Sequence, residues 1–207
     1  MPSKTFLNLP KEKKVKFIKK SLLEFSTHRL KDASINRIVK SCDIARGSFY
    51  QYFNDIFDLY YYIFEVSREK FDAAFSKSIE KNKDLRKAFI DYYDTIIDYS
   101  TKRSNIKYFE NVFRDMTLVS IKEDFSKNKK EIIGEIVSNI DKKYINRVGK
   151  NEFLYIIELL YIETVNSVIE VLIYKESKKV SKNKFIKNIN FITKDMYKWG
   201  MYGNSNY

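Results

Sequence analysis

Residues 34–53, which read SINRIVKSCDIARGSFYQYF, decide the fold of this chain. Ser34 can cap a helix that starts at Ile35, because a serine hydroxyl at that position accepts a hydrogen bond from the first helical turn. Ile35, Ile38 and Val39 then share one helical face, and that face must be buried. The stretch predicts a helix-turn-helix whose short second helix is rich in aromatics and suited to lying against a DNA backbone.

A tight turn is expected next, with Cys42 and Ile44 pointing inward, and a second helix follows it. Phe49 and Phe53 lie four positions apart and are predicted to share the buried face of that helix. Gly47 stands near its start, where a residue without a Cβ lets backbone N–H groups approach a phosphate closely. The outward face is predicted to carry Arg46, Ser48, Tyr50, Gln51 and Tyr52.

Each of these residues also has a purely structural interpretation. Ser34 can serve only as a cap, although a capping hydroxyl can also contact phosphate. Tyr50 and Tyr52 can be packing aromatics, since the chain has 16 tyrosines, and Arg46 can be a solvated surface charge. Cys42 is expected to be a small buried apolar residue rather than a reactive thiol.

The N-terminal third resembles the TetR family of one-component bacterial transcription regulators. The match is carried by an apolar first helix that ends near Phe25, by Ser34, and by Ile-Val at positions 38 and 39. Residues 46–53 follow the family pattern of a basic residue, Gly, Thr or Ser, an apolar residue, Tyr, any residue, an aromatic or His, and Phe; Leu59 matches the next leucine. The resemblance implies a DNA-binding face made of Ser34, Arg46, Gly47, Ser48, Tyr50, Gln51 and Tyr52.

Three residues depart from that family pattern. Arg29 takes the place of a usual glycine, Ala45 replaces the usual serine cap of the third helix, and Ile56 replaces a lysine that touches phosphate. We therefore expect fewer phosphate anchors than is typical, offset by the basic first helix.

Charge is concentrated at the N-terminus. The chain has a net charge of +12, and residues 1–54 contain 12 basic and 4 acidic residues. An A/T-rich coding genome can explain part of the lysine excess, but not its asymmetry. Such a segment suits a polyanion, because neutralising phosphates releases counterions.

Composition predicts an all-α protein, since 207 residues contain only 5 Gly and 2 Pro. We expect a three-helix helix-turn-helix DNA-binding domain over residues 1–54 and a helical effector-binding and dimerisation domain over residues 55–207. The single cysteine suits a reducing cytoplasm. Residues 1–20 lack the apolar core of a secretory signal, and three glutamates interrupt the apolar stretch 153–173, so we expect a soluble cytoplasmic protein without a membrane partner.

Helices are expected at about 11–28, 55–79, 85–99, 106–125, 129–145, 153–173 and 182–199. Residues 60–64 are apolar all round, and we expect them to be buried between the domains.

The helix at 153–173 has two apolar stripes, whereas one core needs only one. The first stripe contains Phe153, Ile156, Ile157, Leu160, Tyr161, Thr164, Val168 and Leu172. The second contains Ile162, Val165, Ile169 and Ile173. The second stripe is a candidate homodimer interface, joined by Phe185, Ile189, Ile192, Met196 and Trp199 of the last helix. The alternative is a central helix buried within one subunit.

The resemblance implies a pocket for a small-molecule effector that weakens operator binding. Aromatic residues could line such a pocket for an apolar or aromatic ligand, or could be plain core: Tyr92, Tyr93, Phe109, Phe113 and Tyr161. The alternative is a DNA-binding factor of the same fold that contacts a protein partner instead of a small molecule.

An enzyme is not expected, because His28 is the sole histidine and the sequence has no metal-spaced cluster or phosphate-binding loop. No cofactor or metal is predicted. His28 is expected to end the first helix.

Overall fold

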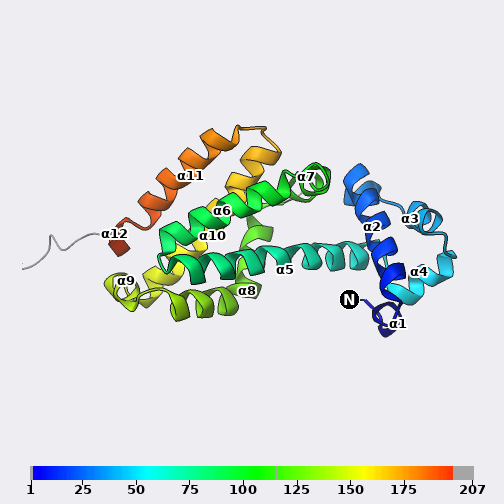
Figure 1. Cartoon of the computed structure of the whole chain (residues 1–207), viewed down its shortest axis with the longest axis horizontal. Coiled ribbons are helices and arrows are strands. Elements are labelled where there is room, and N and C mark those ends of the chain that lie inside the picture. The colour runs from blue at the N-terminus through cyan, green and yellow to red at the C-terminus, as the bar shows by residue number, and fades with distance from the viewer. Residues whose placement is uncertain (1, 115, 198–207) are drawn as a thin grey trace, which may run out of the picture. The chain divides into compact units, whose positions relative to one another are not determined.

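The computed structural model describes residues 2–114 and 116–197, and every regular element within them is helical. This confirms the all-α fold that the sequence predicts (Figure 1). Contacts divide the described residues into two compact units, one of residues 2–72 and 99–114 and the other of residues 73–98 and 116–197. These units are defined by contacts within the chain. The division into a DNA-binding domain of residues 1–54 and an effector-binding domain of residues 55–207 stays a prediction. None of the helices described combines the length and apolar character of a membrane-crossing segment.

The first unit contains the helix-turn-helix. Its elements are α1 (Lys4–Leu7), α2 (Lys11–Thr27), a 3-10 turn (Leu30–Asp32), α3 (Ile35–Cys42), α4 (Arg46–Tyr52), the first part of α5 (Ile56–Asn82) and α7 (Ile106–Arg114). Pro10 precedes α2, where its fixed φ suits a helix start. Asp43 ends α3 in the left-handed conformation, with φ 59°, and so turns the chain toward α4. Aspartate is one of the few residues that adopt this conformation readily.

Four phenylalanines pack together in the core between α1, α2 and α4, and no more than 3% of any of them is exposed: Phe6, Phe17, Phe49 and Phe53. The Phe6 and Phe53 ring centroids are 4.9 Å apart, and the Phe17 ring stacks on Phe53 at 5.9 Å. Phe53 is buried as predicted, although it follows the last residue of α4. Helix α1 was not predicted from the sequence; it lies beside α4 in Figure 1 and supplies Phe6.

The second unit is built around one helix, α10. It contains the end of α5, most of α6 (Leu85–Ser100), α8 (Leu118–Asn139), α9 (Lys142–Val148), α10 (Lys150–Leu172), α11 (Lys178–Ile192) and α12 (Lys194–Tyr197). α10 packs against α8 and α11. The first apolar stripe is buried, apart from the half-buried Tyr161, and this confirms its prediction as core.

The predicted helices at 106–125 and 129–145 were wrong. Helix α7 ends at Arg114, and α8 begins after Thr117, whose hydroxyl accepts a hydrogen bond from the Ser120 N–H in a reciprocal capping box. α8 then continues through residues 126–128 to Asn139. Asp141 caps α9 by accepting a hydrogen bond from the Lys143 N–H. These short polar caps start helices at positions where the apolar pattern shows no break.

Two further expectations were wrong. The predicted helix at 182–199 ends at Ile192, because Thr193 leaves the helical path; its hydroxyl accepts a 2.6 Å hydrogen bond from Nε of Arg86. Trp199 lies outside the described residues. Tyr61 is 62% exposed, so the start of α5 is not buried all round.

Candidate nucleic-acid interface

Arg46 and Tyr50 form an exposed cluster with Asn36 that joins α3 to α4. The Arg46 guanidinium donates a 3.1 Å hydrogen bond to the Asn36 side-chain oxygen and a 3.3 Å hydrogen bond to the Tyr50 hydroxyl. The Tyr50 side chain is 49% exposed, and its ring packs edge-on against Phe49. Both acceptors are neutral, and no carboxylate in the described part of the chain forms an ion pair with Arg46. The positive charge is therefore held in place without being neutralised.

Gly47 is exposed at the second position of α4. A Cβ added to Gly47 would meet no atom within 4 Å, and φ of Gly47 lies outside the range that favours glycine. Neither packing nor backbone conformation therefore requires a glycine here. A glycine in a helix costs about 0.5–1 kcal/mol relative to alanine, so the folded chain alone does not explain this residue.

Ser34 occupies the predicted N-cap position of α3, but its predicted side-chain cap is absent. The Ser34 hydroxyl accepts no hydrogen bond from α3. Its backbone N–H instead donates a 2.8 Å hydrogen bond to a carboxylate oxygen of Glu24 on α2. Because Ser34 is partly exposed and its hydroxyl does not cap α3, the hydroxyl stays available to an external group.

Glu24 fastens α3 to α2. This carboxylate is 93% buried, being only 7% exposed, and accepts hydrogen bonds from Nε and the terminal nitrogen of Arg37, the shorter at 2.6 Å. His28, which follows α2 as predicted, places Nδ1 3.5 Å from the same carboxylate. Burial by itself would raise the pKa of Glu24, but the hydrogen bonds from Arg37 and Ser34 outweigh it and lower the pKa below its usual value of 4.5.

Glu24→Gln is expected to lower the free energy of unfolding at neutral pH by about 1–3 kcal/mol, because it weakens a buried, charge-assisted cluster. Since the folded-state pKa is lowered, the stabilisation exists above the unfolded pKa and is lost as pH falls through the folded pKa. Thermal unfolding of both proteins at about pH 7 and about pH 3 should show the difference shrinking in acid. The control is Glu12→Gln, an exposed glutamate on the same helix. An equal loss in both variants would contradict the role of Glu24.

The other predicted site residues of α4 divide between its outer and inner faces. Gln51 is exposed and Ser48 is partly exposed. Tyr52 differs from the prediction: it is half-buried, with its ring centroid 5.8 Å from both the Phe6 and Phe17 rings. The prediction placed Tyr52 outward, but a residue three positions after the buried Phe49 lies on the same side of the helix, and α1 covers that side. Packing against Phe6 and Phe17 therefore explains the position of most of the Tyr52 ring, as the structural interpretation of this residue predicts.

The five aromatics proposed for an effector pocket do not belong to one unit. Phe109 and Phe113 are in the first unit, and the three tyrosines are in the second. The Tyr93 ring stacks on Phe185 at 4.5 Å, and its hydroxyl donates a hydrogen bond to Ser181. Phe109 is 1% exposed and packs against Phe71 and Tyr99. Tyr93 and Phe109 therefore pack as core, and the position of an effector stays a prediction.

Sequence reasoning missed three contributors to this surface. Asn36 holds Arg46, and its signal was a polar residue on the outer face of α3. Glu24 looked like an ordinary helix glutamate, and its role depends on Ser34 and Arg37, which lie 10 and 13 positions later. Ser3 holds the end of α4, because its N–H donates to the Tyr52 carbonyl at 2.9 Å and its hydroxyl donates to the Gln51 carbonyl at 2.5 Å.

The chain is similar to known proteins both in sequence profile and in fold. The profile of the family described as "Tetracyclin repressor-like, C-terminal domain" matches residues 84–194, more than half of the chain. The fold is similar to that of a TetR family transcriptional regulator from Chloroflexus aurantiacus J-10-FL, with a TM-score of 0.53 and 20% sequence identity over 94% of this chain and 97% of that chain. No curated protein sequence matches. At this identity the structural likeness shows the fold, whereas the profile match shows the family. The chain belongs to the TetR family of transcriptional regulators.

Proposed function

We propose that this protein is a cytoplasmic, homodimeric repressor that binds a palindromic operator in double-stranded DNA and is released by a small apolar or aromatic molecule. We assign it no catalytic activity. The observation that carries the DNA assignment is the exposed surface of α4, where an unneutralised Arg46 adjoins a glycine that the fold does not require. A surface that combines a fixed cation with room for close backbone approach fits a phosphate backbone.

The remaining contacts follow from the placement of α3 and α4. The Ser34 hydroxyl, which caps no helix, is proposed to donate to a phosphate. Ser48, Tyr50 and Gln51 extend the same face of α4. Glu24 and Arg37 hold α3 against α2, so that the DNA surface is fixed before DNA binds and its ordering costs less on binding.

A second copy of the chain is the proposed partner of α10. Its second apolar stripe (Ile162, Val165, Ile169 and Ile173) remains only half-buried in the single chain. Phe185, Ile189 and Met196 are no part of this interface, because each is 0% exposed within its own chain, which corrects the prediction. Exposed apolar area on a helix already packed on its other face supports an interface. A two-fold dimer would place two α4 helices in successive major grooves, about 34 Å apart.

Ile169→Asp is expected to convert the dimer to monomers, because burying an unpaired carboxylate in an apolar interface costs several kcal/mol. Sedimentation velocity at matched concentrations measures the change. Val137→Asp, an exposed residue of α8 outside the stripe, is the control and should leave the mass unchanged. If Ile169→Asp stays dimeric, another surface forms the interface.

Selection of bound sequences from random DNA tests the proposal in one experiment. We expect enriched duplexes with two inverted half-sites, centred about one helical turn or a multiple of it apart. Enrichment of single half-sites without symmetry would contradict the dimer. The absence of any enrichment over random duplex would contradict operator recognition.

The enriched duplex also tests release. A small apolar or aromatic molecule that acts as effector should raise the melting temperature of the protein alone and lower its affinity for the duplex, because a ligand shifts populations only by binding one state more tightly. Release by a protein partner, without any small molecule that does both, would instead support the alternative function.

A further inference from the structure

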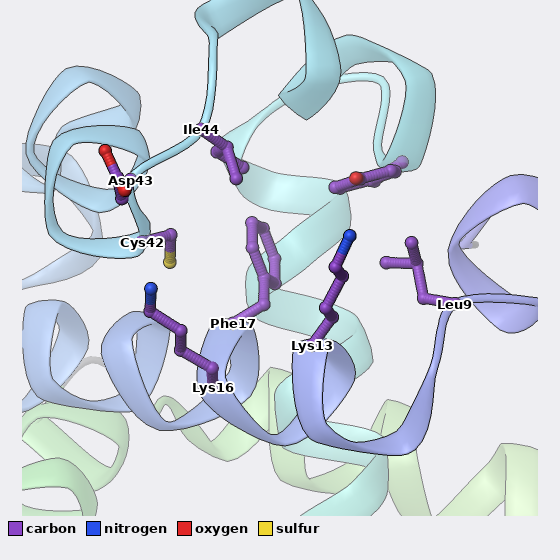
Figure 2. A pocket seen from close by; sticks show the side chains of 8 residues that line it. Leu9, Lys13, Lys16, Phe17, Cys42, Asp43 and Ile44 are labelled. Carbon is purple, nitrogen blue, oxygen red and sulfur yellow. The ribbon is translucent and has the colours of Figure 1, made fainter.

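A small cleft opens between α2 and the turn that joins α3 to α4. Its volume is about 210 Å³. Phe17, Ile44 and Tyr52 contribute apolar walls, and Figure 2 shows the Lys13 and Lys16 side chains rising from α2 into the space between these elements. All of these elements belong to the first compact unit.

The charge of the cleft favours an anion. Lys13 and Lys16 are exposed, and neither forms an ion pair or hydrogen bond in residues 2–114 and 116–197. Asp43 is the one acid among the lining residues described, and it pairs with neither lysine. Two ammonium groups that point into one cleft without a carboxylate partner raise the local positive potential, and a bound anion would satisfy it.

The size and place of the cleft narrow the choice of anion. Pockets for drug-sized ligands measure about 300–1,000 Å³, so this cleft suits a group of the size of a phosphate. It also adjoins the proposed DNA surface, because Ile44 lies just before α4 and Tyr52 is its last residue. A helix of 7 residues spans about 10 Å, so the cleft lies within one helix length of Arg46.

We propose that this cleft binds a backbone phosphate of operator DNA, with Lys13 and Lys16 donating to its oxygens. The proposal rests on DNA binding by α4 and extends that interface onto α2. A free phosphate anion has the same chemistry, and the experiment separates the two sources.

The test compares two double variants of the full chain on the selected duplex. Lys13→Gln with Lys16→Gln removes the cleft cations, and Lys11→Gln with Lys19→Gln removes equal charge from exposed positions of α2 that do not line the cleft. The magnitude of the slope of log affinity against log salt should fall by about one for the cleft pair, because one phosphate contact is lost, and by clearly less for the control pair. Affinity should fall similarly for cognate and random duplexes, because a phosphate contact carries no sequence information.

The possible outcomes distinguish failure of the proposed function from failure of the cleft proposal alone. If the wild-type protein binds no duplex above background, the proposed function fails and this inference fails with it. If the wild type binds but both pairs change the slope equally, only the inference is overturned. Inorganic phosphate is the probe for the other source. Suppose that it raises the melting temperature of the wild type but not of the cleft pair, while both pairs bind DNA alike. The cleft then holds free phosphate, and its assignment to a DNA phosphate is wrong.

Discussion

Gly47→Glu is expected to lower affinity for the selected duplex at least about 100-fold, while helicity, dimer mass and melting temperature stay near wild-type values. The fold tolerates the new side chain, since a Cβ at Gly47 meets nothing within 4 Å. The DNA does not tolerate it, because a carboxylate on this face of α4 stands against phosphates, and such like-charge contact costs several kcal/mol. Fluorescence anisotropy with labelled duplex measures the loss.

Two variants separate a DNA effect from a folding effect. Gly134→Glu makes the same change at an equally open glycine of α8 and should leave DNA affinity unchanged. Gly47→Ala should raise the free energy of unfolding by about 0.5–1 kcal/mol, because alanine is the better helix former, and should nevertheless weaken DNA binding. If Gly47→Ala binds DNA as wild type does and Gly47→Glu loses little affinity, α4 does not lie against DNA.

Phe6→Ala is expected to lower the free energy of unfolding by about 3–5 kcal/mol, the usual cost of removing a fully buried phenylalanine. Phe6 is 0% exposed and its ring contacts those of Phe17, Phe53 and Tyr62. Urea unfolding measures the loss as a lower transition midpoint. DNA affinity should fall as well, because α1 supports the inner side of α4 through the Tyr52 ring.

Leu7→Ala is the matched control, one residue further along α1. Leu7 is 51% exposed, so its truncation should change stability by no more than about 0.5 kcal/mol. The pair therefore distinguishes loss of the aromatic core from fraying of a short helix. Equal small effects in both variants would show that α1 does not close the core.

The helix-turn-helix could be predicted because its signals are local. The spacing of Ile38, Val39 and Phe49 indicates which faces are buried, and all three are buried. Helix starts in the second unit were harder to predict: the apolar pattern continues where Thr117 and Asp141 begin new helices. A cap acts through one hydrogen bond and leaves no trace in hydrophobic periodicity.

The sequence by itself determined the all-α class, the basic first quarter, the position of α4 and the buried stripe of α10. Each depends on composition or on residues within one or two helical turns. Only the tertiary structure decided that Glu24 accepts the Ser34 backbone N–H, that Phe6 covers Tyr52, and that Lys13 and Lys16 share a cleft. The reason is physical: a periodic pattern shows that a face must be covered, but the partner that covers it, or that completes a hydrogen bond, is chosen by segments distant in sequence when the chain packs.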